Sequence, residues 1–264
     1  MAESHAAADG KLKVFVSYSR QDSSNFTAEL VEGLKLVGFT PKLDLHDIAK
    51  GEAWEARLGG LIQEADTVVF VISPKAVKSE RCQWEVAKTI ELSKRLLPVV
   101  WINVPEADVP PKLRQLNYTY FSEGKSFTKA LGELAEALRQ DLDWIREHTR
   151  IGELVARWQS RGRPESLLLR GDDLDAARAW VANRKPAAPE ITDLQQSFLN
   201  ASAETETARL SKERQQIEDM RRAQDETTRS KRSNALLRRE SQRNWQYFAL
   251  VVLVVAVVVR CAAR

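Results

Sequence analysis

Residues 67–73 read TVVFVIS, an unbroken apolar and β-branched run of strand length. A run without polar alternation is typical of a strand that helices cover on both faces of a parallel sheet. Four more strands are expected around it, at 12–17 (LKVFVS), 39–45 (FTPKLDL), 96–102 (LLPVVWI) and 117–121 (NYTYF). Pro41 places the second of these at a sheet edge, because proline has no N–H to donate to a neighbouring strand.

Helical periodicity separates these strands. Between Ser23 and Val37 apolar residues recur three and four apart, and Gly38 ends that helix. Further helices are expected at 53–64, 79–93 and 126–141. The alternation of strand and helix predicts an α/β domain with a flavodoxin-like parallel sheet of five strands in the order 2-1-3-4-5.

The rest of the chain has a different organisation. Residues 1–10 are polar and small and are expected to be a disordered leader without a secretion signal. Residues 142–185 predict a small helical segment of two or three short helices, and PAAPE after it is a linker. The polar stretch up to 244 predicts a long charged helix, with a weak coiled coil and a solvated single helix as equal alternatives.

An uncharged run, WQYFALVVLVVAVVV, occupies residues 245–259. It predicts a terminal hydrophobic helix that serves as a single-pass membrane anchor at 245–260, and the basic residues before it would keep the larger part of the chain in the cytoplasm. The alternatives are a buried docking helix and the first part of a longer span. The predicted localisation is therefore the membrane.

Bulk composition excludes several classes of function. The net charge of +3 does not indicate nucleic-acid binding, and two distant cysteines indicate a reducing compartment. The chain contains no GxGxxG, no P-loop and no zinc-ligand spacing, so neither a cofactor nor a metal is expected.

Ligands of an open parallel sheet bind beyond the carboxyl ends of the strands, where the strand order reverses. In the predicted order this point lies between the first and third strands, which are followed by SYSRQD (17–22) and SPKAVKSERCQWE (73–85). Glu85 follows Cys82 by three positions, so the two share one helix face. The alternative for Glu85 is an exposed carboxylate that pairs with Lys88 or Arg81, and Cys82 alone is more often a small buried residue than a nucleophile.

Three stretches in order resemble the Toll/interleukin-1 receptor (TIR) domain. They are KVFVSYSRQD (13–22), DLHDIAKGEAW (44–54, like the BB loop) and VVFVISPKAVKSERCQWE (68–85). The resemblance covers about 11–141, and the S-x-x-C-x-x-E signature is similar to that of bacterial members. Many such members hydrolyse or cyclise NAD⁺, whereas many animal members only assemble.

The resemblance implies specific site residues. Glu85 stands where the enzymatic members have their catalytic glutamate. The implied substrate contacts are Ser19, Arg20, Ala49, Lys50, Trp54 and Cys82. Two positions depart from the family's pattern: Ala49 stands where an acidic residue is common, and Arg81 stands where an aromatic is common, with Trp84 as a nearby substitute.

One carboxylate suits the chemistry that the resemblance implies. Breaking the ribose–nicotinamide bond builds positive charge on the sugar, which a carboxylate stabilises without a metal or a second acid. The expected function is NAD⁺ cleavage, with NAD⁺ as substrate and not as cofactor, on self-association of the domain or its association with other TIR proteins. The alternatives are a non-catalytic signalling scaffold and a nucleoside-transferring enzyme on a related scaffold.

Overall fold

The protein is described by a computed structural model over residues 11–44, 54–122, 124–186 and 188–262. Side chains of the C-terminal helix are described up to residue 248, apart from 235–237 and 240. The chain divides into two compact units, residues 1–204 and 205–264.

The first unit contains a five-stranded parallel sheet in the order β2-β1-β3-β4-β5, which confirms the predicted fold class. Its strands are β1 Lys13–Ser17, β2 Thr40–Lys42, β3 Thr67–Ile72, β4 Arg95–Val100 and β5 Thr119–Tyr120. β2 lies at an edge, as Pro41 indicated, and it is shorter than its apolar run because only three residues pair with β1.

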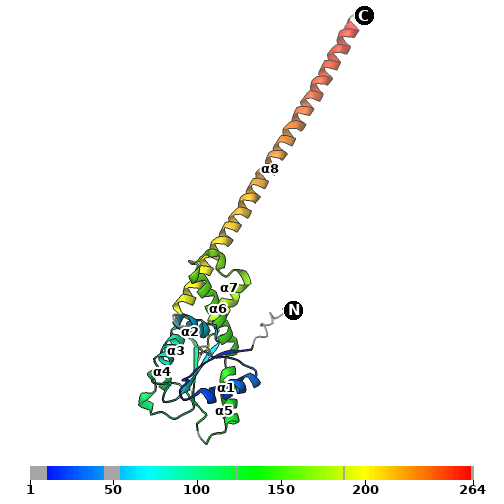
Figure 1. The fold of residues 1–264 in the computed structure, drawn as a ribbon. Helices are drawn as coiled ribbons and strands as arrows, with labels where there is room; N and C mark the ends of the chain where they lie inside the picture. The colour runs from blue at the N-terminus through cyan, green and yellow to red at the C-terminus, as the bar shows by residue number, and fades with distance from the viewer. Residues whose placement is uncertain (1–10, 45–53, 123, 187, 263–264) are drawn as a thin grey trace. The chain divides into compact units, whose positions relative to one another are not determined.

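Helices cover both faces of the sheet (Figure 1). They are α1 Ser24–Leu36, α2 Trp54–Glu64, α3 Glu80–Glu91, α4 Pro111–Arg114 and α5 Phe127–Arg139. Alternate side chains of β3 point to opposite faces: Val69 and Val71 pack with α1 and α5, whereas Val68 and Phe70 pack towards α2 and α3. This two-sided burial explains why β3 is apolar at every position from Val68 to Ile72.

The first unit continues into a helical extension. It consists of α6 Leu142–Ser160, α7 Gly171–Ala182 and the first turns of α8 Asp193–Ala262. Trp144, Ile151 and Trp158 of α6 belong to the same apolar core as β1 and α1. Polar contacts add to this packing, because Lys94 Nζ, just before β4, donates to Thr149 Oγ1 of α6 at 3.0 Å.

The second unit is the remainder of α8. Its described side chains are almost all exposed, and neighbouring turns form ion pairs such as Arg209–Glu213 at 3.4 Å. Such i,i+4 pairs stabilise a solvated helix by a few tenths of a kcal/mol each. Nothing in the described part of α8 supports the coiled-coil alternative.

The membrane anchor expected at 245–260 is a wrong prediction. Among the helices that the structure describes, none has an 18-residue stretch apolar enough to cross a bilayer. The uncharged stretch between Arg243 and Arg260 is shorter than the ~20 residues that a spanning helix needs. The predicted membrane localisation rested on this anchor and is contradicted as well. The side chains beyond residue 248 lie outside the described residues.

Candidate active site

A cavity of about 210 Å³ lies beyond the carboxyl end of β1. The end of β1 and the loop after it form one wall, and the first turns of α3 form the other. Its lining residues are Phe15, Val16, Tyr18, Ser19, Arg20, Gln21, Asp44, Ser79, Arg81, Cys82 and Glu85. The cavity is therefore at the sheet edge where ligands of parallel sheets bind.

Local sequence places Glu85 on the inner face of α3. Ser79 caps the helix, and its hydroxyl accepts a hydrogen bond from the backbone N–H of Cys82 at 3.3 Å. Glu85 is then in the second turn and is only 5% exposed. Lys88 pairs instead with Glu91 at 2.6 Å. Glu85 is therefore not the exposed helix carboxylate that the sequence left open as an alternative.

Ser17 is the direct partner of Glu85. It is the last residue of β1, and its hydroxyl donates a hydrogen bond to Glu85 Oε2. Burial raises the pKa of Glu85 to about 7, although the Ser17 hydrogen bond and the positive charge of Arg81 act in the opposite direction and the charge of Asp44 raises the pKa further. Glu85 therefore titrates near neutral pH.

Cys82 lies one helical turn before Glu85 and is buried. Its Sγ donates to the backbone carbonyl of Tyr18 at 3.5 Å. Burial, followed by the nearby charge of Glu85, raises the pKa of the Cys82 thiol to about 11. At neutral pH Cys82 is thus a neutral thiol that packs the cavity wall, because a nucleophilic cysteine needs a lowered pKa.

Three guanidinium groups surround the buried carboxylate of Asp44. Arg81 pairs with Asp44 Oδ2, and Arg20 Nη2 lies 3.7 Å from the same oxygen and donates to the Asp44 carbonyl at 2.7 Å. Arg57 Nε lies 3.9 Å from Oδ1. Among the described residues, Asp44 is thus the common ionic partner of three arginines from three different segments.

Two tryptophans support the arginine cluster from outside the cavity. The Trp54 and Trp84 rings meet edge to face at 5.1 Å, and Arg81 Cζ lies 5.9 Å from the Trp54 ring centre. Neither tryptophan is among the described residues that line the cavity. Arg81 thus lines the cavity itself, and its guanidinium makes a cation–π contact with the Trp54 ring, which packs on Trp84.

A third carboxylate, that of Asp22, links the two loops that bound the cavity. Asp22, after β1, accepts hydrogen bonds from Ser73 Oγ at 2.8 Å and from the backbone N–H of Lys75 at 2.9 Å. Both donors belong to the segment between β3 and α3. These bonds hold the loop after β1 against the loop that leads to Glu85.

The structure brings together most of the site residues expected from the sequence. Ser19, Arg20, Cys82 and Glu85 line one cavity, and Trp54 lies behind it. Ala49 and Lys50 fall in 45–53, outside the described residues.

Sequence reasoning missed the site contacts of Ser17 and Asp44, and it treated Arg81 as a departure from the family pattern or as a surface partner of Glu85. The sequence does predict which way Ser17 points, because residues two apart in a strand, such as Phe15 and Ser17, lie on the same face. No local signal shows that Asp44 collects three arginines, since they come from three different segments.

Comparison with known proteins decides the family of this region. The family model described as "TIR domain" matches residues 14–135. This part of the chain is a TIR domain. The chain is similar to the "Probable 2' cyclic ADP-D-ribose synthase BdTIR" of Brachypodium distachyon. The two are 25% identical over 169 residues, which is 58% of this chain and 75% of that protein.

Two solved structures resemble the chain at lower sequence identity. The metazoan TIR-STING receptor of C. gigas, in complex with 2',3'-cGAMP, is 22% identical with a TM-score of 0.39. The match covers 46% of this chain and 38% of the receptor chain. The TIR domain of the Toll-related receptor TRR-2 of Hydra magnipapillata is 19% identical with a TM-score of 0.37, over 50% of this chain and 97% of that chain.

Proposed function

We propose that this TIR domain cleaves the bond between ribose and nicotinamide in NAD⁺, with Glu85 as the catalytic residue. The observation that carries the proposal is the burial of Glu85, 5% exposed, in the wall of a cavity at the carboxyl edge of the sheet. The name of the Brachypodium relative, a cyclic ADP-ribose synthase, supports the same reaction class.

The reaction begins with the departure of nicotinamide. The bond between C1′ of the ribose and the ring nitrogen breaks, its electron pair goes to nicotinamide, and nicotinamide leaves uncharged. Positive charge develops on the sugar, and the ionised and buried Glu85 stabilises it. Water or a hydroxyl of the substrate then bonds to C1′ and releases a proton, which Glu85 can accept.

The size and charge of the site suggest how NAD⁺ is oriented. A cavity of about 210 Å³ is too small for a whole dinucleotide, so we assign it to the nicotinamide and its ribose. The diphosphate then lies at the mouth, where the side chains of Arg20 and Arg81 are 41% and 37% exposed. Guanidinium groups bind phosphate oxygens through paired hydrogen bonds.

Self-association belongs to the same proposal, because the family resemblance connects activity with assembly. The test is nicotinamide release from NAD⁺ by purified full-length protein over a hundredfold range of protein concentration. We expect release whose rate per protomer rises with concentration, and chromatography of the nucleotide product separates ADP-ribose from its cyclic forms. An absence of nicotinamide at every concentration would favour the scaffold alternative.

A further inference from the structure

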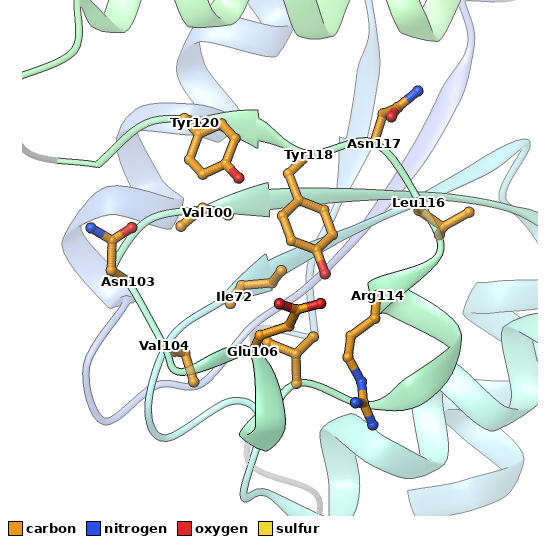
Figure 2. A pocket seen from close by; sticks show the side chains of 11 residues that line it. Ile72, Val100, Asn103, Val104, Glu106, Arg114, Leu116, Asn117, Tyr118 and Tyr120 are labelled. Atoms are coloured by element: carbon orange, nitrogen blue, oxygen red, sulfur yellow. The ribbon is translucent and has the colours of Figure 1, made fainter.

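A second and larger cavity, of about 620 Å³, lies at the same edge of the sheet (Figure 2). Ile72, Val100 and Tyr120, the last residues of β3, β4 and β5, line it together with residues of the segment from Asn103 to Tyr118. Its volume lies within the range of small-molecule sites. None of its lining residues lines the Glu85 cavity.

The cavity has an apolar floor and an aromatic wall. Ile72, Val100 and Val109 are all buried below it. The rings of Tyr118 and Tyr120 lie 6.2 Å apart at 59°, and Tyr120 is 47% exposed. Large aromatic faces beside an apolar floor suit a flat ring system, which can stack on or meet them edge to face.

Polar groups converge on the same space. They are Asn103, Glu106, Arg114, Asn117, Tyr118 and Tyr120. Within the described part of the chain, none of these side chains makes a hydrogen bond or ion pair with another residue. In Figure 2 the hydroxyl of Tyr118 points towards Glu106, and Arg114 lies on the same side of the cavity. The Glu85 cavity differs, because its carboxylates are already paired with Ser17 and with arginines.

We propose that this cavity binds a purine nucleoside monophosphate, at a site separate from the Glu85 cavity. The purine lies against Tyr118 and Tyr120, and the amides of Asn103 and Asn117 offer both donors and acceptors to its edge. Arg114 binds the phosphate, and Glu106 accepts from the ribose hydroxyls. One cation and one carboxylate suit a single phosphate better than a polyphosphate. The site goes beyond the proposed function and does not depend on Glu85.

The test is calorimetric titration of the full-length protein with AMP, adenosine and ribose 5-phosphate. We expect saturable binding of AMP, weaker binding of adenosine and the weakest binding of ribose 5-phosphate, because stacking of the base is the largest contribution. Tyr118→Ala should weaken AMP binding about tenfold or more. Arg114→Gln, at an exposed position, should weaken binding of AMP but not of adenosine.

Two control variants separate this site from the Glu85 cavity. Glu85→Gln and Arg81→Gln should bind AMP as the wild type does, and Arg114→Gln should leave nicotinamide release unchanged. The proposal is overturned by an absence of AMP binding, or by AMP binding that Arg81→Gln weakens and Arg114→Gln does not. Either result is independent of whether the protein cleaves NAD⁺.

Discussion

At the residue scale, opposing effects set the charge of Glu85. Burial favours the neutral acid, whereas the Ser17 hydroxyl and the Arg81 guanidinium favour the carboxylate. The resulting pKa of about 7 leaves a substantial fraction of Glu85 ionised at neutral pH. A carboxylate in so little water interacts strongly with a nearby positive charge, which is what a cationic sugar requires.

The first prediction concerns pH. Because the pKa of Glu85 is raised from 4.5 to about 7, the carboxylate is present above pH 7 and is lost as the pH falls. We expect kcat/KM for NAD⁺ to fall about tenfold per unit below pH 7. The Cys82 thiol, with its pKa near 11, does not titrate in this range. Rates that stay constant from pH 5 to 8 would contradict the assignment.

The second prediction concerns Arg81. Replacing it with glutamine removes one of the guanidinium groups at the mouth of the cavity while keeping a hydrogen-bonding side chain. A charge-assisted hydrogen bond to phosphate contributes roughly 1.5–3 kcal/mol, so KM for NAD⁺ should rise about tenfold or more, with a smaller change in kcat. Lys112→Gln, at an exposed position outside the cavity, is the control. Equal KM values for the two variants would remove Arg81 from the diphosphate site.

At the element scale, the strands and helices were predictable because their signals are local. The apolar run of β3, the proline of β2 and the Ser79 cap each specify structure within a few residues. The contacts that make the site are not local. Ser17 and Glu85 are 68 positions apart, and they meet only because β1 and β3 are neighbours in the sheet. The membrane-anchor prediction failed because it relied on the apolar character of residues 245–259, a stretch shorter than the ~20 residues that a spanning helix needs.

The third prediction concerns His148 of α6, which is only 3% exposed. Burial and the nearby charge of Lys94 lower the pKa of His148 from 6.5 to about 4. The contact of 3.1 Å between its Nε2 and the Glu190 carbonyl acts in the opposite direction and raises this pKa. The lowered pKa means that the folded state binds fewer protons than the unfolded state between pH 6.5 and 4. The contribution of His148 to stability is therefore present above pH 6.5 and is lost as the pH falls towards 4.

Chemical denaturation at pH 7 and pH 5 measures this effect. The shift of the His148 pKa corresponds to at most about 3 kcal/mol of unfolding free energy across the whole range. His148→Gln lowers stability at pH 7, because the site is buried, but it should show a smaller loss between pH 7 and pH 5 than the wild type. An identical loss in both proteins would show that another group titrates.

At the scale of the whole molecule, the TIR domain and the extension share one apolar core. Trp144, Ile151 and Trp158 of α6 pack in the cluster that contains Val14 and Leu30 of the sheet domain. The family match ends at residue 135, but the apolar core continues past that residue into the extension. The fourth prediction is that a chain ending at 141 unfolds at lower denaturant concentration than a chain ending at 204, because it exposes the surface that α6 covers. Equal midpoints would mean that the extension contributes no stability.

The central claim is that Glu85 is the catalytic carboxylate of an NAD⁺-cleaving enzyme. The most direct measurement is nicotinamide release by wild type, Glu85→Gln and Glu91→Gln, each with a thermal melt. Glutamine keeps the size of the side chain but removes its negative charge, so Glu85→Gln should lose ~10²–10³ in rate. Glu91, an exposed carboxylate on the same helix, should tolerate the same change at full rate. A Glu85→Gln protein that melts like the wild type and releases nicotinamide at the wild-type rate would contradict the claim.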